Sequence, residues 1–315
     1  MPLLTLRSVI FETEKVLETR QHAQPPLLVK DRDSGVEVLL KVLRIRRLGL
    51  LVQEAGSPRP YIVWDPLLRL HRIDYARVCR YHTGPPGKPW EHTYCTHIAV
   101  GREGYCRSHA NSAKALYEKC AQGSESACNQ AYELLKGEEF SVYVLDYGGS
   151  KVKVGLTQEW RLIWRIAEQP HVAAAKVFTG GLREARGLEK KLGRHRIATE
   201  GVAVRVKERM LKAAREVERI NSEANRIAKR LASFIAALGF SGTFEAYTIL
   251  PMNNRPTEIV KAREVGVGEL ELELLALSDY WAGRMLLETM KSKVTIDKNM
   301  LLHRLLDAMV SPRRE

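Results

Sequence analysis

The sequence contains few cysteines and no long uninterrupted apolar run. Five cysteines occur among 315 residues, and a small, odd number does not suit a framework of disulfides. No apolar run approaches the ~20 residues of a membrane-spanning helix. Residues 1–10 lack the charged start, apolar core and cleavage site of an export signal. We therefore expect a cytoplasmic protein, not inserted in a membrane, whose cysteines are reduced thiols or metal ligands.

The composition is also poor in amide side chains. Asn and Gln occur seven times each while Arg, Glu and Leu are plentiful, a balance typical of thermophile proteins. Neither an internal repeat nor a low-complexity segment is present. Positive charge is in excess, with a formal net charge of +13. This excess favours a polyanionic partner, DNA or RNA, although a basic protein without such a partner would carry the same charge.

Residues 1–75 are expected to form a β-rich N-terminal module. Short apolar runs occur at 36–43, 48–52 and 61–64, and residues that favour turns lie between them. This pattern predicts a small barrel or a sandwich.

Residues 76–138 are expected to form a zinc-binding segment followed by a helix. The part before residue 110 is rich in Gly, Pro, Cys and His and has little with which to build a hydrophobic core. Zn²⁺ prefers four thiolate or imidazole ligands in a tetrahedron. The spacing predicts a structural zinc site, and the candidate ligands are Cys79, Cys95, Cys106 and His109, with His97 or His82 as alternatives for the fourth.

The other two cysteines lie on the helical stretch expected at 111–136. Cys120 and Cys128 are eight residues apart, and they are interpreted as core thiols. No H-E-x-x-H helix accompanies the cluster, so a catalytic zinc is not expected.

Residues 139–200 carry a hairpin followed by two helices. Tyr143 and Lys153 lie on the two strands, across a turn at 146–150, and can stand on one face of the hairpin. A helix at 159–169 presents Arg161 and Arg165, four residues apart and therefore on one side. A strand is expected near 174–179, and a second helix, which ends at Leu192, carries Glu189.

This order of motifs resembles the GIY-YIG nuclease superfamily. Ser141-Val142-Tyr143 stands where the first motif would be, and Lys153-Val154-Gly155 stands where the second would be. The form Lys-Val-Gly-x-Thr, which ends at Thr157, is similar to a divergent branch in which lysine replaces the second tyrosine. "RIAEQPH" at 165–171 and "GLEKKL" at 187–192 fit the helices that bear the arginine and the glutamate. The Cys/His-rich segment upstream is similar to that of an uncharacterised prokaryotic family with a GIY-YIG-like domain.

The resemblance implies a role for each matched residue. Tyr143 would orient or activate water, Arg165 would hold the scissile phosphate with Arg161 as a second contact, and Glu189 would bind Mg²⁺ or Mn²⁺. Lys153 departs from the pattern, because a lysine with an unperturbed pKa near ~10.4 is a poor base at neutral pH but a good phosphate contact.

Residues 201–315 are expected to form a long basic amphipathic helix and a β-containing tail. Apolar residues recur every three or four positions over 202–238, and basic residues fill the opposite face. In the tail, 269–275 alternates as a strand does, 278–279 favours a turn, 282–287 a return strand and 298–309 a helix. Candidate nucleic-acid contacts are Arg161, Lys151, Arg205, Lys212, Arg215 and Arg219.

The chain is therefore expected to be an α+β protein with a β-rich start, a zinc segment, a small GIY-YIG-like core, a basic helix and a mixed tail. The leading hypothesis is a protein that binds DNA or RNA and acts as a divalent-metal-dependent phosphodiesterase. The first alternative is a zinc-stabilised binder of RNA or DNA, for example on ribosomal particles, that does not cut. The second is a protein-interaction factor that uses the long helix.

Overall fold

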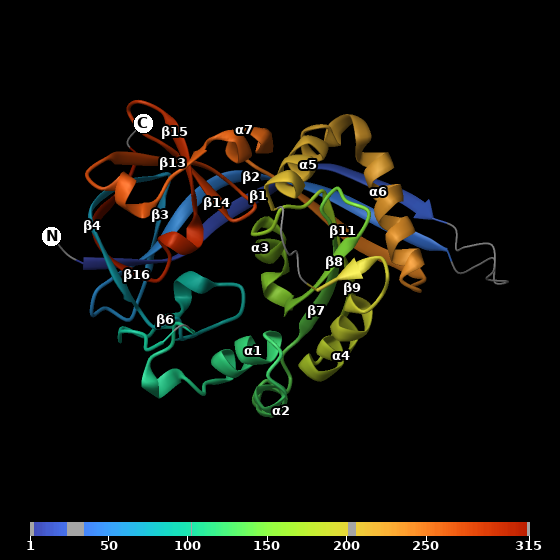
Figure 1. Cartoon of the computed structure of the whole chain (residues 1–315), viewed down its shortest axis with the longest axis horizontal. Helices are drawn as coiled ribbons and strands as arrows, with labels where there is room; N and C mark the ends of the chain where they lie inside the picture. Colours follow the sequence, from blue (N-terminus) through green and yellow to red (C-terminus); the bar gives the residue numbers. More distant parts are fainter. Residues whose placement is uncertain (1–2, 24–34, 102, 201–205, 314–315) are drawn as a thin grey trace. The chain divides into compact units, whose positions relative to one another are not determined.

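Figure 1 shows the computed structural model of the chain, which describes residues 3–23, 35–101, 103–200 and 206–313. The chain mixes helices with a large mixed sheet, as expected, and it divides into two compact units. Unit 1 comprises Met1–Glu12, Arg46–Leu134 and Lys261–Glu315; unit 2 comprises Thr13–Ile45 and Leu135–Val260. Neither unit is continuous in sequence. The layout in consecutive modules 1–75, 76–138, 139–200 and 201–315 stays a prediction.

Two long strands contribute residues to both units. They are β1 (Leu3–Ala23) and β2 (Val36–Glu54), and β2 joins two runs that the sequence suggested as separate strands. Both strands are rich in β-branched and charged residues. Charged side chains on the two strands form cross-strand ion pairs, such as Arg44–Glu14 in unit 2.

The sheet of unit 2 is built around β7, which is the first strand of the predicted hairpin. β7 pairs antiparallel with β8 on one side and β9 on the other; β9 in turn pairs with β11, and β11 runs parallel to β2. Every residue of β7 is buried, which explains why its sequence is largely apolar rather than alternating. The strands are β7 (Phe140–Asp146), β8 (Val152–Gln158), β9 (Ala173–Gly180), β10 (Ala198–Thr199) and β11 (Gly242–Leu250).

Helices cover both faces of this sheet. Tyr143 and Asp146 project from opposite faces of β7 because neighbouring side chains alternate along a strand. Gln169, just after α3, bonds to Tyr143, whereas Arg230 of α6 bonds to Asp146, so α3 and α6 cover opposite faces (Figure 1). The helices are α3 (Leu162–Ala167), α4 (Leu182–Gly193), α5 (Val206–Glu218), α6 (Ile220–Ala237) and α7 (Pro256–Lys261).

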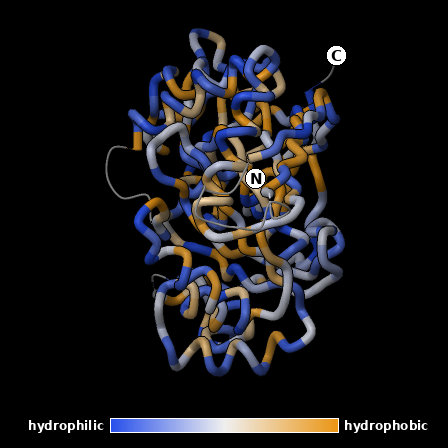
Figure 2. The backbone as a smooth tube through the Cα atoms, turned by 90° about the vertical axis from the view of Figure 1, so that its right-hand side faces the viewer, coloured by the Kyte–Doolittle hydropathy of each residue, from blue (hydrophilic) through white to orange (hydrophobic). Residues whose placement is uncertain are grey.

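Unit 1 contains the β-rich remainder and the Cys/His segment. β16 pairs with the start of β1 and with β4, and β4 continues through β13, β14 and β15. Figure 2 shows hydrophobic stretches running through the interior and hydrophilic ones at the turns. The elements are β3 (Tyr61–Trp64), β4 (Pro66–Arg77), β5 (His82–Thr83), β6 (Thr93–Tyr94), α1 (Ala113–Ala121), α2 (Glu125–Leu134), β12 (Arg263–Glu264), β13 (Leu274–Trp281), β14 (Arg284–Glu288), β15 (Lys293–Asp297) and β16 (Arg304–Pro312).

The C-terminal helix expected at 298–309 was wrong. A single 3₁₀ turn, Lys298–Met300, precedes β16, which pairs with β4 and places Leu306 and Ala308 in the core. Leucine and alanine are good helix formers, but pairing with a strand more than 200 residues earlier in the sequence overrides that local preference.

The strand expected at 269–275 was also largely wrong. A 3₁₀ helix, Val267–Leu270, covers its first two residues, and β13 begins only at Leu274. β13 then runs through the turn expected at 278–279, and the chain reverses instead at Ala282 and Gly283, both with positive φ. Two consecutive left-handed residues are typical of a tight hairpin turn. The return strand β14 confirms the expectation for 282–287 apart from its exact ends.

The long basic helix is two helices. α5 ends at Glu218, Arg219 has non-helical backbone angles, and α6 begins at Ile220. The apolar spacing continues across this break, so the sequence pattern does not show it. Glu216 of α5 stabilises the bend between the two helices by accepting hydrogen bonds from Arg226 and Arg230 of α6.

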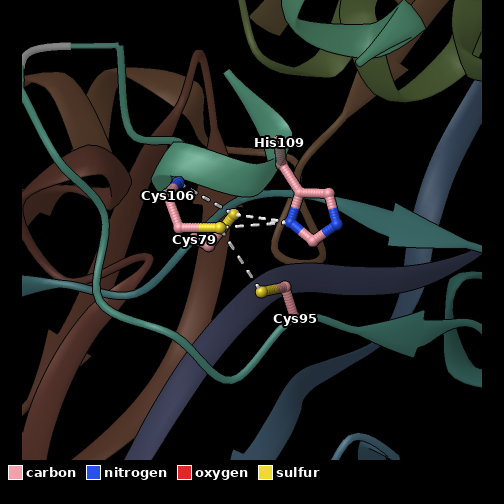
Figure 3. A group of neighbouring side chains, drawn as sticks. All are labelled: Cys79, Cys95, Cys106 and His109. Carbon is pink, nitrogen blue, oxygen red and sulfur yellow. Dashed lines mark hydrogen bonds between the residues drawn. The ribbon is translucent and has the colours of Figure 1, made fainter. Parts of the chain in front are cut away.

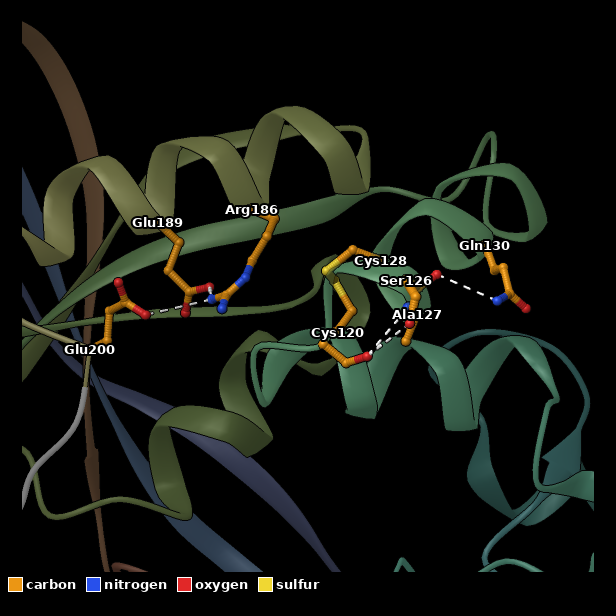
Figure 4. Close-up of a disulfide and its surroundings, with 9 residues drawn as sticks. Cys120, Ser126, Ala127, Cys128, Gln130, Arg186, Glu189 and Glu200 are labelled. Atoms are coloured by element: carbon orange, nitrogen blue, oxygen red, sulfur yellow. Dashed lines mark hydrogen bonds and ion pairs between the residues drawn. A yellow bond between two sulfur atoms is a disulfide. The ribbon is translucent and has the colours of Figure 1, made fainter.

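Cys120 and Cys128 are not free thiols. They form a disulfide that joins α1 to α2 (Figure 4), and both residues are buried. The helical stretch expected at 111–136 is split at Gly123, and the resulting helical hairpin brings two cysteines eight residues apart to a Cα–Cα distance of 4.5 Å. This distance lies within the range that a disulfide spans.

The contact between Gly155 and Tyr143 gives a prediction about stability. A Cβ atom at position 155 would lie 2.3 Å from the Tyr143 Oη and 2.4 Å from its Cζ, and the fully buried ring has no space to retreat. Gly155→Ala should therefore lower the free energy of unfolding by about 1–3 kcal/mol, measured by denaturant unfolding.

The loss of unfolding free energy caused by Gly155→Ala should be smaller by at least ~1 kcal/mol in a Tyr143→Leu background, because the ring that causes the clash is absent. Gly187→Ala is the matched control: it lies on α4 with nothing within 4 Å of the added Cβ, and it should be neutral or stabilising. Equal costs of Gly155→Ala in both backgrounds would contradict the contact.

Candidate functional site

The predicted metal ligands come together in unit 1. The ligand atoms of Cys79, Cys95, Cys106 and His109 all lie within 4.8 Å of one another (Figure 3). Cys79 follows β4, Cys95 follows β6, and Cys106 caps the 3₁₀ turn Arg107–His109 that presents the imidazole. Segments 30 residues apart in sequence therefore meet at a single point.

The separations fit one tetrahedral ion. The His109 Nδ1 lies 3.2 Å from the Cys106 Sγ and 3.7 Å from the Cys79 Sγ, and the Cys95 and Cys106 sulfurs are 3.9 Å apart. Ligand atoms about 2.3 Å from a common tetrahedral centre are separated by about 3.8 Å. A disulfide would need sulfurs about 2.05 Å apart. The group is close enough to hold a metal ion.

A buried arginine supports two of these ligands. Arg7 is 3% exposed, and its Nη1 and Nη2 donate 2.7 Å hydrogen bonds to the carbonyl oxygens of Cys79 and Cys95. Its Nε donates to the Gln53 side chain. Three thiolates and a divalent ion would leave one net negative charge, so a guanidinium beside them is electrostatically favourable. Burial lowers the pKa of Arg7 to about 10, and it stays a cation at neutral pH.

The structure favours His109 among the three candidate imidazoles. His82 stacks on His92 with ring centroids 4.4 Å apart and contacts Lys114, so it lies outside the group. His97 is exposed, and although its Nδ1 lies 3.4 Å from the Cys95 Sγ it does not belong to the mutually close set. The His109 ring is stacked on Tyr81 at 3.8 Å, which fixes its orientation.

The purified protein should contain about one tightly bound metal ion per chain, measured by elemental analysis. Cys106→Ser should lose it and lower the melting temperature by more than about 5 °C, since each kcal/mol corresponds to about 2–4 °C in a chain of this size. The paired change Cys120→Ser, Cys128→Ser is the control and should keep the metal. Full metal content in the Cys106→Ser protein would refute the site.

In unit 2, the hairpin places Tyr143 and Lys153 on one face, as the spacing predicts. Tyr143 is paired with Gly155 across β7 and β8, and Lys153 is paired with Leu145 one step further along. A side chain that sequence reasoning missed connects the two: Gln169 donates from Nε2 to the Tyr143 Oη at 2.8 Å, and its Oε1 accepts from the Lys153 Nζ at 2.5 Å.

The electrostatics of Lys153 differ from those expected. Burial, aided by repulsion from Arg165 and opposed by Glu189, lowers the pKa of Lys153 to about 8. This value lies below the ~10.4 of an unperturbed lysine, so an appreciable fraction of the Lys153 amine is neutral near pH 7–8. Tyr143 is 1% exposed, and burial raises the pKa of its phenol, so the hydroxyl stays protonated.

Arg165 and Arg161 lie at the edge of this group and reach solvent. Their side chains are 42% and 34% exposed, and both pair with Glu168. The Arg165 guanidinium is close enough to the Tyr143 hydroxyl to oppose the rise of its pKa. An exposed guanidinium beside a buried polar pair is able to contact a phosphate.

Glu189 faces inward but already has a cationic partner. It is 8% exposed and pairs with Arg186, one turn earlier on α4, and Glu200 lies 3.8 Å from the same guanidinium (Figure 4). Burial raises the pKa of Glu189, and Arg186 opposes the rise. Glu189 acts electrostatically on both Tyr143 and Lys153, so it belongs to the same group of side chains.

The predicted nucleic-acid contacts lie mostly on exposed surface. Lys212, Arg215 and Arg219 are exposed on α5 and at the start of α6, and Lys151 is exposed in the hairpin turn. The turn packs on α5: a Cβ at Gly148 would lie 3.5 Å from the Lys212 Cβ. Arg205 lies outside the described residues.

Comparisons with protein-family models, with curated proteins and with solved structures find no match to this chain. The GIY-YIG resemblance and the roles that it implies therefore stay predictions. Among the described residues, no helix has the length and apolar character needed to span a membrane.

His171 is a second residue that the sequence analysis overlooked. It is fully buried; its Nε2 accepts from the Ile249 backbone N–H at 2.9 Å, so its proton must lie on Nδ1, which donates to the Gln169 carbonyl at 2.8 Å. This imidazole ties the residue that bridges Tyr143 and Lys153 to β11. The surrounding "QPH" gave no periodic or motif signal for such a role.

The stability of the protein should depend on pH through His171. Burial lowers the pKa of His171 from 6.5 to about 4, so the unfolded chain binds this proton more readily. The contribution of the neutral His171 imidazole to the free energy of unfolding is fully present above pH 6.5. It is lost as the pH falls towards 4, by up to ~1.4 kcal/mol per pH unit. Denaturant unfolding of wild type and His171→Asn should show a stability difference that shrinks over this window. A difference independent of pH would rule out the neutral buried imidazole.

Proposed function

We propose that the protein binds nucleic acid through unit 2. The observation that carries the proposal is a set of exposed cations on α5, α6 and the bend between them in a chain of net charge +13. Among the described residues no ion pair involves any of them, in contrast to Arg226 and Arg230, which pair with Glu216. The set consists of Lys207, Lys212, Arg215, Arg219 and Lys229. Cations held on helices without internal partners are available to phosphates.

In this proposal the metal centre has a structural role: it stabilises the fold of unit 1. Three thiolates and one imidazole in a closed tetrahedral set suit Zn²⁺, and no ligand position is left for substrate. We therefore assign a structural Zn²⁺ to Cys79, Cys95, Cys106 and His109. Thiolate ligands suit a reducing compartment, and we place the protein in the cytoplasm; a disulfide such as Cys120–Cys128 also occurs in intracellular proteins of hyperthermophiles.

A second function is favoured by one further observation. Tyr143 and Lys153 share Gln169 as a hydrogen-bond partner, Arg165 and Glu189 influence the pKa of both, and the four residues follow one another along the chain in the order of a GIY-YIG-like phosphodiesterase. In that role Arg165 holds the phosphate, the Lys153 amine accepts a proton or contacts the phosphate, and Glu189 binds Mg²⁺ or Mn²⁺, which would polarise the phosphate. Against this role, Tyr143 is buried and Glu189 must share its carboxylate with Arg186.

A binding assay with salt titration tests the proposal. The logarithm of the binding constant for DNA or RNA should fall linearly with the logarithm of salt concentration, and Lys212→Ala and Arg215→Ala should each reduce the slope by about 1. Lys291→Ala, an exposed lysine of unit 1, is the control and should leave the slope unchanged. Binding without salt dependence, or none at all, would contradict the proposal.

The same protein incubated with Mg²⁺ or Mn²⁺ separates the two functions. Cleavage that disappears in Glu189→Gln and in Arg165→Ala supports the phosphodiesterase. Salt-sensitive binding without cleavage assigns a binding protein that does not cut.

A further inference from the structure

The outward face of α3 and of the turn that leads into it has an unusual composition. The inward face is formed by Leu162, Ile166 and Ala167, which are buried against the sheet. Trp160, Arg161, Trp164, Arg165 and Glu168 occupy the other side, since they are spaced by one, three and four positions. An amphipathic helix normally turns its large apolar side chains to the core and its charges to solvent. Here two tryptophans alternate with two arginines on the face opposite the core.

The two indoles form a defined arrangement. Their ring centroids are 5.9 Å apart at an interplanar angle of 76°, and both residues are only partly buried. The Arg161 guanidinium lies over the Trp160 ring, 5.8 Å from its centroid, so a positive charge is held directly beside the aromatic pair.

This face adjoins the Tyr143 group. Arg165 directly follows Trp164 and acts on the Tyr143 hydroxyl, and Gln169 donates to the Arg165 carbonyl at 2.8 Å and so fixes this end of the helix. A phosphate at Arg165 would have its own or the neighbouring base within reach of Trp164. Partly exposed aromatic rings beside guanidinium groups are the elements that bind unpaired nucleotides, since every base has a face that stacks.

We infer that this face is a stacking platform for unpaired nucleobases, so that the nucleic acid bound by unit 2 contains single-stranded or unpaired nucleotides. The inference rests on the proposed function and names its substrate class. Backbone charge alone would favour a duplex, which carries phosphates at twice the density along its length. Stacking reverses that preference, because the bases of a duplex are covered by their own neighbours.

The test compares three probes of about 12 nucleotides with the unmodified protein: a single strand of thymidylates, an abasic strand with the same phosphates, and a duplex. At equal salt, the thymidylate strand should bind at least ~10-fold more tightly than either of the others, because each stacked base contributes about 1–3 kcal/mol. This comparison needs no variant and stands even if a tryptophan change prevents folding.

Variants then locate the platform. Trp164→Ala and Trp160→Ala should each lower the affinity for the thymidylate strand by about 5- to 150-fold and leave the affinity for the abasic strand unchanged. Trp164→Phe should keep most of the affinity for the thymidylate strand. Trp90→Ala, a 39% exposed tryptophan of unit 1, is the matched control and should have no effect.

Equal binding of the thymidylate and abasic strands would overturn the stacking platform and leave the proposed function intact. Failure of all three probes to bind would overturn both.

Discussion

The rest of unit 2 depends on how the Tyr143 side chain is held. Its ring packs against Gly155, and the Gln169 amide connects its hydroxyl to Lys153. A side chain at position 155 would displace the ring, and loss of the amide would remove a hydrogen-bond partner from both Tyr143 and Lys153. Because Gln169 also bonds to the Arg165 carbonyl, the same amide fixes the end of α3 on the sheet.

Charge is distributed unevenly between the interior and the surface. Two buried acids of unit 2 are paired internally: Asp146, which is fully buried, accepts from Arg230, and Glu189 accepts from Arg186. Separating such a pair is costly because one charge is then left without compensation. Each of these pairs is close to neutral, and unpaired positive charge in unit 2 lies on exposed lysines and arginines such as Lys212 and Arg215. A polyanion can neutralise these charges without disturbing the core, whereas the proposed catalysis requires Glu189 to release part of its interaction with Arg186.

The sequence predicted well what depends on local pattern and poorly what depends on distant partners. The hairpin, β9, α4 and the four Cys and His side chains that come close enough to hold a metal ion were predicted because strand alternation, glycine positions and ligand chemistry are visible over short windows. β16 was mistaken for a helix because its partner β4 lies more than 200 residues away. The break at Arg219 has no glycine or proline to mark it, and the roles of Gln169, His171 and Arg7 exist only through hydrogen bonds to residues that folding brings near.

The central claim is that unit 2 binds nucleic acid through α5, α6 and the outward face of α3, while the metal centre stabilises unit 1. Photo-crosslinking of the full chain to a single-stranded oligonucleotide, followed by mass spectrometry of the crosslinked peptides, maps the contact directly. The account predicts crosslinks within 159–168 and within 206–230, and none in the metal-binding loops of unit 1. Crosslinks confined to residues 79–109, with unit 2 unlabelled, would contradict it.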